Sequence, residues 1–377
     1  MLRRAFVLLL GTVGLGACQP AAPIAMNQAP GARSPGAAGQ VAILLPLSGK
    51  LGDVGKPMLR AAQLSLAQPG SPVLEAKDTG GTPEGAATAA REAIAAGARM
   101  ILGPLTSAET ALVGPIARQA GVPVLAFTND QSQSRPGVWT LGITPSQQIN
   151  RLLAAVKDAG REPVAALLPN NDFGKAMADG LTRATAEAGL PAPFIRMHNP
   201  GKDAITEAVD ALAATATEGQ PPPFGAILLG ATGNDLKVFA KAFADRKIDR
   251  TKIQILGPAL WVEPASGSSA LVGAWFAMPD PDMRRDMSAN YEARYKEAPP
   301  ARVDLAHDAA SIARVLAGQG QMNTAGLTQP VGFNGVDGWL ALSPDGQVRR
   351  GLAVFRVERQ RATRIGVAQA GPGKPGS

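Results

Sequence analysis

Polar side chains recur in this sequence where short apolar runs end, and their types suit the binding of a small solute. Hydroxyl, amide and carboxylate groups follow the runs near residues 45, 102, 127, 168, 229 and 256, and two aromatic residues accompany them. The candidate ligand-binding residues are Ser48, Thr106, Ser107, Thr128, Asn129, Asp130, Asn171, Phe173, Thr232 and Trp261. For any one of the polar residues, capping a helix is the simpler interpretation. Their shared place at the ends of strands favours a joint site.

Catalytic and metal-binding patterns are missing from the sequence. There is no Gly-x-Ser-x-Gly, Gly-x-x-x-x-Gly-Lys-Ser/Thr, His-Glu-x-x-His or Ser-x-x-Lys motif. The two histidines are interpreted as structural, since His198 ends a predicted strand and His307 lies in a predicted helix. We therefore predict a binding protein that is not an enzyme and that has no cofactor and no metal.

The elements that position these residues alternate from Val41 onward. Short apolar runs, such as 41–45 and 124–127, are separated by amphipathic stretches, which is typical of βαβ units and a parallel sheet. Thr106-Ser-Ala-Glu109 predicts a capping box, and Thr144 and Asp203 are predicted to begin later helices. In parallel sheets, ligands bind outside the carboxyl ends of the strands, which is where the candidate residues lie.

The length of the body predicts two domains, because about 330 residues exceed what one core usually spans. The fold class is α/β, with two doubly wound parallel-sheet lobes joined by a multi-strand hinge. Residues 41–140 plus about 275–330 are expected to form lobe 1, with four strands in its first part. Residues 141–274 plus about 331–360 form lobe 2, and 361–377 a flexible tail. Hinge crossings are expected near 127–142 and 256–277.

The first forty residues predict export and anchoring. Arg3 and Arg4 precede an uncharged stretch, 5–17, that is too short to cross a bilayer, so 1–17 is interpreted as a signal peptide. Cys18 is the only cysteine and follows Leu-Gly-Ala, which resembles a bacterial lipobox. A chance cysteine after an ordinary cleavage site is the alternative. Residues 18–40, rich in Pro, Ala and Gly, are expected to be a lipidated disordered tether.

Several short motifs resemble those of the type I periplasmic binding fold over about Val41 to Glu358. They are Leu-Leu-Pro-Leu-Ser-Gly at 44–49, Ile-Leu-Gly-Pro-Leu-Thr-Ser at 101–107, Gly-Val-Pro-Val at 121–124, Asn-Asp-Phe-Gly at 171–174 and His-Asp-Ala-Ala at 307–310. The resemblance extends to leucine/isoleucine/valine-type receptors and to penicillin-binding-protein activator lipoproteins, and Phe-Thr-Asn-Asp at 127–130 leans toward the activators.

The resemblance implies roles for particular residues. In the amino-acid receptors, the ligand's carboxylate is bound at positions that match Ser107 and 128–130. The acid that holds the ligand's ammonium group has no counterpart at Ala259, and Glu263 is the nearest substitute. This departure argues against the usual mode of amino-acid binding.

Two functions fit these observations. The first is a receptor that delivers an amino acid or a similar small polar or amphipathic solute to an ABC permease. The second is a lipoprotein that activates a peptidoglycan synthase with the same fold. Ala259 and Gln19 favour the second function, since by resemblance Gln19 permits outer-membrane sorting. The polar loops favour the first function.

For either function, the protein is expected in the periplasm. Acyl chains on Cys18 are expected to hold it to a membrane, and the outer membrane is favoured. The formal charge of +7 comes without a basic stripe interleaved with aromatics, so no nucleic-acid partner is expected.

Overall fold

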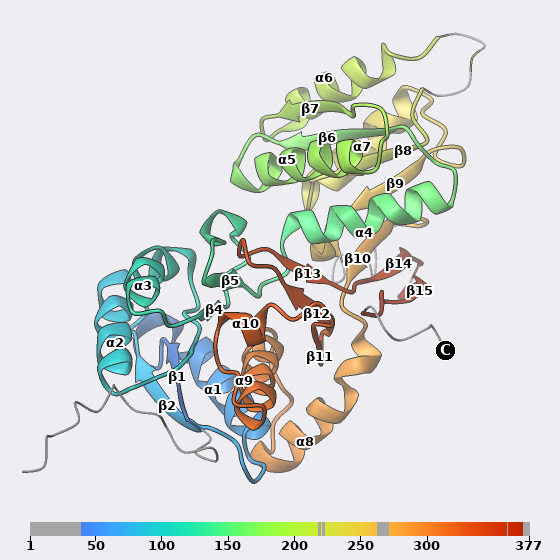
Figure 1. Ribbon diagram of the computed structural model, residues 1–377. Coiled ribbons are helices and arrows are strands. Elements are labelled where there is room, and N and C mark those ends of the chain that lie inside the picture. The colour runs from blue at the N-terminus through green and yellow to red at the C-terminus, as the bar shows by residue number, and fades with distance from the viewer. Residues whose placement is uncertain (1–38, 218–219, 221–222, 262–270, 360, 372–377) are drawn as a thin grey trace, which may run out of the picture. The chain divides into compact units, whose positions relative to one another are not determined.

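The computed structural model describes residues 39–217, 220, 223–261, 271–359 and 361–371. The predicted signal peptide, Cys18 and nearly all of the tether lie outside the described residues, as does Glu263. The described part contains three sheets, in two α/β lobes (Figure 1). None of its helices combines the length and the apolarity that crossing a bilayer requires.

The first lobe is built on a parallel sheet with strand order β2-β1-β3-β4-β5. Its strands are β1 (Gln40–Leu45), β2 (Val73–Asp78), β3 (Ile101–Leu102), β4 (Val124–Ala126) and β5 (Val138–Thr140). The helices between them are α1 (Gly52–Ser65), α2 (Pro83–Ala95) and α3 (Ser107–Gln119), and the later helices α8 (Arg285–Tyr295), α9 (Val303–Gly318) and α10 (Thr324–Leu327) return to this lobe. Short 3-10 turns precede α1, follow β4 and precede α8; they are η1 (Gly49–Leu51), η2 (Gln131–Gln133) and η5 (Pro281–Arg284). The lobe thus has five parallel strands, one more than predicted.

The second lobe contains a sheet with strand order β15-β14-β10-β9-β8-β6-β7. Its parallel part consists of β6 (Val164–Pro169), β7 (Phe194–His198), β8 (Ala226–Leu229), β9 (Gln254–Gly257) and β10 (Trp275–Met278). Two antiparallel strands, β14 (Ala353–Val357) and β15 (Ala362–Gly366), complete one edge. The connecting elements are α4 (Pro145–Asp158), α5 (Asp172–Glu187), α6 (Lys202–Ala213), α7 (Asn234–Asp245) and η3 (Ala259–Trp261). Strand β15 lies in the segment that was expected to be a flexible tail.

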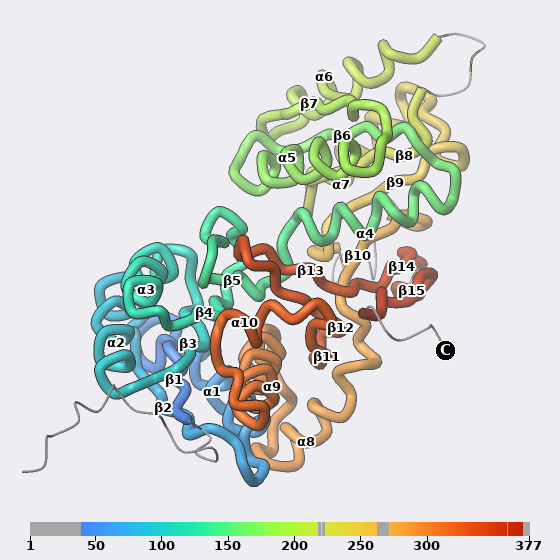
Figure 2. The backbone as a smooth tube through the Cα atoms, viewed as in Figure 1, coloured from blue at the N-terminus to red at the C-terminus, as the bar shows by residue number. Residues whose placement is uncertain are grey.

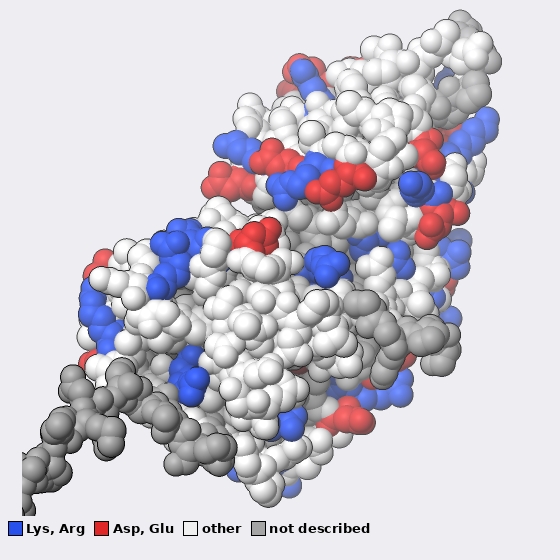
Figure 3. All heavy atoms as spheres, viewed as in Figure 1, with Lys and Arg blue, Asp and Glu red and all other residues white. Residues whose placement is uncertain are grey.

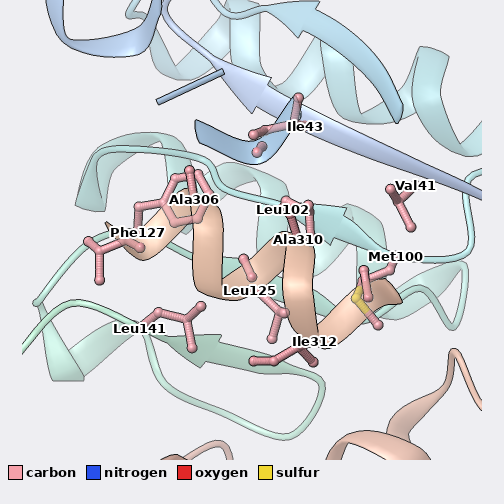
Figure 4. Close-up of a cluster of buried hydrophobic side chains, with 14 of the residues drawn as sticks. Val41, Ile43, Met100, Leu102, Leu125, Phe127, Leu141, Ala306, Ala310 and Ile312 are labelled. Carbon is pink, nitrogen blue, oxygen red and sulfur yellow. The ribbon is translucent and has the colours of Figure 1, made fainter. Parts of the chain in front are cut away.

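Side-chain alternation explains how each sheet buries both faces. On β1, Ile43 and Leu45 belong to the core beneath α1 and α9, whereas Ala42 and Leu44 belong to the core beneath α2 and α3. Figure 4 shows the first of these cores, with Ala310 of α9 close to Leu102 of β3. The larger sheet is covered in the same way by α6 and α7 on one face and by α4 and α5 on the other.

Local capping signals begin several helices where the sequence predicted. Thr106 and Glu109 form a capping box at α3, and Thr144 and Gln147 form another at α4. The predicted cap of α6 is wrong: Gly201 is the N-cap residue, and Asp203 lies inside the first turn. A carboxylate in the first turn is still stabilised by the positive end of the helix dipole.

The chain crosses between the lobes three times, which can be followed in Figure 2. The crossings follow β5, β10 and β13, so the second comes after Met278, later than predicted. The third differs more. A small antiparallel sheet of β11 (Phe333–Gly335), β12 (Gly338–Leu342) and β13 (Val348–Arg350) packs into the first core, although 331–360 was expected to complete lobe 2. Of residues 331–360, only those after 350 join the larger sheet.

Candidate functional site

A cavity of about 720 Å³ lies at the carboxyl ends of β3 and β4. It is walled by apolar side chains and has polar groups among them. The apolar residues include Leu51, Val54, Leu105, Phe127, Ile143, Met278 and Leu305, and the polar residues are Thr106, Thr128, Asn129, Asp280, Arg284, Arg302, Asp304 and Asp337. Residues 142–143 and 278–281, which belong to two of the three crossings, also line it. We call this space the crossing cavity.

Thr106 reaches the crossing cavity, but its hydroxyl is engaged in capping. The Thr106 Oγ1 donates to Glu109 Oε2 at 2.9 Å, and the backbone N–H of Thr106 donates to the same oxygen at 2.9 Å. The other oxygen, Glu109 Oε1, accepts from Thr79 Oγ1 at 2.5 Å, and Glu109 is fully buried. The helix-cap interpretation therefore describes Thr106 well. Its role here is to fix the start of α3 beside the cavity.

Ser107 and Asp130 bond to each other and do not line the crossing cavity. Ser107 Oγ donates to Asp130 Oδ2, and the backbone N–H of Ser132 donates to Asp130 Oδ1 at 3.0 Å. Partial burial raises the pKa of Asp130, but the bonds from Ser107 and Ser132 outweigh it, so the pKa lies below its usual value. Asp130 is therefore an anion at neutral pH. It accepts the hydrogen bond of the Ser107 hydroxyl, which the resemblance assigned to a ligand's carboxylate.

Thr128 and Asn129 also line the crossing cavity. Thr128 is buried, and its Oγ1 accepts from the backbone N–H of Asp130 at 3.1 Å, so its hydroxyl proton remains free to donate. Asn129 is exposed at the cavity wall. It also lines a second cavity of about 790 Å³, together with Asp130 and Phe173.

The other predicted residues cap a helix, pack in a core or are exposed outside the crossing cavity. Asn171 caps α5 by accepting from the backbone N–H of Gly174 at 2.9 Å, and Phe173 is half-buried against the core beneath α4 and α5. Thr232 and Ser48 are exposed, and neither lines a cavity described here. Trp261 is fully buried, and its Nε1 donates to the carbonyl oxygen of Ala231 at 2.8 Å. That is the environment of a core residue, so Trp261 does not belong to the proposed site.

A buried charged cluster beside the crossing cavity was missed in the sequence. Arg284 Nε lies 2.7 Å from Asp304 Oδ1, and Arg350 Nη1 lies 3.9 Å from both Asp308 Oδ2 and Asp337 Oδ2. The pKa of Asp304 is raised to about 6 and that of Asp337 to about 7, mainly because burial disfavours the charged form. The sequence feature that points to the cluster is the His-Asp-Ala-Ala motif at 307–310, which contains Asp308.

The described residues contain no group of three or more His, Cys, Asp or Glu side chains placed to hold a metal ion. On the face shown in Figure 3, Lys and Arg side chains lie in small groups between uncharged surface and acidic residues. The cavity, and not a charged patch on this face, is therefore the candidate site.

Comparison with known proteins gives one family and many structural neighbours. A family model described as periplasmic binding protein matches residues 40–362. No curated protein matches in sequence. Many solved structures resemble the chain, and three are informative.

The first is a putative branched-chain amino acid ABC transporter protein from Rhodospirillum rubrum, with a TM-score of 0.73 and 20% identity over 86% of this chain and 99% of that one. The second is an ABC transporter solute-binding protein from R. palustris in complex with benzoate, with a TM-score of 0.55 and 18% identity over 89% and 98%. The third is full-length LpoA from Haemophilus influenzae, with a TM-score of 0.64 and 16% identity over 87% of this chain and 58% of that one. At these identities the likeness shows the fold alone.

Proposed function

Because the chain belongs to the periplasmic binding protein family, we propose that it binds a small polar or amphipathic solute in the periplasm, without catalysis, and delivers it to an ABC-type importer. The observation that carries this proposal is the crossing cavity at the carboxyl ends of β3 and β4. An amino acid or a close relative fits its mixture of apolar walls and polar ends.

The size and place of the crossing cavity support a receptor. Its volume of about 720 Å³ lies within the range of small-molecule sites, roughly 300–1,000 Å³. Residues of two crossings line it, so a bound solute contacts the segments that a hinge motion would bend. A ligand that contacts one hinge conformation better than another shifts the population toward that conformation. Binding here can therefore be signalled to a permease.

A thermal-shift screen tests the receptor proposal. A solute that binds only the folded chain adds about 2.7 kcal/mol of stability at a hundredfold excess over its Kd. Asn129→Ala removes an exposed amide from the cavity wall and should weaken that solute's binding by about twofold to tenfold, since one polar contact is worth roughly 0.5–1.5 kcal/mol.

The matched control is Asn170→Ala, an exposed asparagine outside the cavity lining that bonds to Asn199 at 3.2 Å. Both variants should keep the stability of the unliganded protein within about 0.5 kcal/mol. If a broad panel of amino acids, amines, sugars and aromatic acids gives no shift at millimolar concentration, the receptor proposal fails.

A second candidate, activation of a peptidoglycan synthase, is favoured by one observation. Asp130 accepts a hydrogen bond from the hydroxyl of Ser107, and the resemblance assigned that hydroxyl to the carboxylate of an amino acid. A ligand carboxylate at that place would meet a like charge. Retention of a penicillin-binding synthase by the purified chain, together with the absence of any solute shift, would select this candidate.

Anchoring through Cys18 is proposed for either function. Cys18→Ser should move the protein from the membrane fraction to the soluble fraction or leave it unprocessed, because several acyl chains, at about 0.8 kcal/mol per buried CH₂, hold a protein to a membrane almost permanently. Cell fractionation, including separation of inner and outer membranes, measures the effect, and we expect the wild type in the outer membrane. A Cys18→Ser variant with unchanged processing and membrane location would contradict the lipoprotein interpretation.

A further inference from the structure

Asp337 is a buried carboxylate that lines the crossing cavity without a close partner. Its side chain is only 10% exposed, and it contributes to the cavity wall. Among the residues that the structure describes, none donates a hydrogen bond to this carboxylate, and its ion-pair neighbour, Arg350 Nη1, is 3.9 Å away. A buried carboxylate without hydrogen bonds costs several kcal/mol unless a cation or a proton compensates it.

The surrounding structure holds Asp337 in place. Val336 and Asp337 form the turn between β11 and β12, where Gly335 pairs with Gly338. The carboxylate of Asp308, on α9, accepts from the backbone N–H of Val336 at 2.7 Å and from that of Asp337 at 3.4 Å. Asp308 is therefore a positioning residue for the turn, and the Asp337 side chain remains at the cavity wall.

Neither Arg284 nor Arg350 donates a hydrogen bond to Asp337. Arg284 pairs with Asp304, and its Nη2 donates to the carbonyl oxygens of Pro299 and Pro300 at 3.2 and 2.9 Å. The Nη2 of Arg350 donates to the carbonyl oxygen of Leu141 at 2.9 Å. Two guanidinium groups thus face three carboxylates, those of Asp304, Asp308 and Asp337. Within this cluster the carboxylates outnumber the guanidinium groups by one, and Arg302 is a further cation of the cavity wall.

We propose that the crossing cavity binds a solute through a cationic group, a primary amine or a guanidinium, which pairs with the carboxylate of Asp337. The apolar side chains that wall the cavity, such as Leu105 and Phe127, then contact the apolar part of the solute. This assignment rests on the receptor function proposed above and deepens it. It places the cation on the first lobe, whereas position 259, where the resemblance implies an acid, is an alanine.

Matched solutes and matched variants test the assignment in the full-length protein. The probes share a carbon skeleton and differ in charge: phenethylamine, 2-phenylethanol and phenylacetate form one set, and agmatine, putrescine and 1,4-butanediol form another. Calorimetry should show binding of one or both classes of amine at least tenfold tighter than that of their neutral or anionic counterparts. Asp337→Asn keeps the side-chain shape and should weaken amine binding by about thirtyfold or more, which is typical for the loss of one partner of a buried charge pair.

The control variant is Asp282→Asn, which removes the same charge from an exposed carboxylate of η5 that pairs with Arg285 and does not line the cavity. It should leave amine binding within about twofold. Circular dichroism verifies that both variants fold.

The outcomes separate the two proposals. Binding of neutral or anionic probes alone leaves the receptor function intact and overturns the cation site, as does amine binding that Asp337→Asn leaves unchanged. If no probe of any charge binds, the cation site is overturned, and the broad solute screen decides the receptor proposal separately.

The pH dependence gives an independent readout. The carboxylate faces Asp304 and Asp308 of α9, Arg350 of β13 and Arg284 of η5, and burial is the main cause that raises its pKa, to about 7. Since only the ionised carboxylate pairs with an amine, the affinity should rise about tenfold from pH 6 to pH 8, where the amine itself stays protonated. Asp337→Asn should abolish this rise. A wild-type affinity that is flat or falls with pH would contradict the assignment.

Discussion

Replacing Arg350 with methionine should destabilise the protein by about 3–5 kcal/mol, because it leaves buried carboxylates without their cation. The Arg350 side chain is 0% exposed, lies 3.9 Å from Asp308 and Asp337, and donates to the carbonyl oxygen of Leu141 at the first crossing. Methionine keeps most of the volume and supplies no charge. Urea unfolding followed by circular dichroism measures the loss.

Two further variants show whether charge is the cause. Arg349→Met changes the exposed neighbour on the same strand, which stacks over Trp339, and should cost less than about 1 kcal/mol. Arg350→Met combined with Asp337→Asn should recover part of the loss, since one of the uncompensated carboxylates is gone. If the double variant is as unstable as the sum of the two single variants, the pairing between Arg350 and Asp337 contributes nothing.

The sequence predicted the parts of the fold that depend on neighbouring residues. The capping box of Thr106 and Glu109 joins positions three apart, so its pattern is visible in the chain, and the structure contains both of its hydrogen bonds. Gly97 and Gly121 directly follow the C-cap residues of α2 and α3 and adopt positive φ angles, as is typical of glycines that end helices. Strand β5 was missed because three residues are too few to show an alternating pattern.

Long-range packing explains the elements that were assigned to the wrong lobe. The short strands β11 to β13 look like any other apolar run, and nothing local indicates which core buries them. Phe333 and Leu340 pack with residues of β1 and α9, nearly 300 and about 30 residues away in the chain. Such contacts follow from the whole topology and are not contained in a local pattern.

The candidate site was predicted in part for the same reason. Thr106, Thr128 and Asn129 reach the crossing cavity because they follow parallel strands, and the carboxyl ends of such strands share one edge. Asp337 was not predicted, because an aspartate in a hairpin turn is usually interpreted as a turn residue. Its importance comes from Asp308 and Arg350, which lie 29 residues before it and 13 residues after it.

Trp261 lies in a different environment from the one that the sequence predicted. The sequence placed it in a loop after a strand and predicted a ligand contact, whereas the structure buries it completely among the side chains beneath α6 and α7, with its Nε1 bonded to Ala231. Trp261→Ala should therefore cost about 3–5 kcal/mol in the stability of the second lobe, as expected for a large cavity in a core. A residue whose only role is to contact a ligand would leave the unliganded protein almost unchanged.

The neighbouring Leu260→Ala is the matched control, because Leu260 is 58% exposed and its truncation should change stability by no more than about 0.5 kcal/mol. Trp261→Phe retains most of the apolar volume but leaves the carbonyl oxygen of Ala231 without its donor, so an intermediate loss of about 1–3 kcal/mol is expected. Thermal unfolding of the three variants without any solute measures the loss of stability in each, and we expect the largest loss in Trp261→Ala and the smallest in Leu260→Ala. If Trp261→Ala melts with the wild type, the residue is not part of the core, and its indole becomes a candidate ligand contact again.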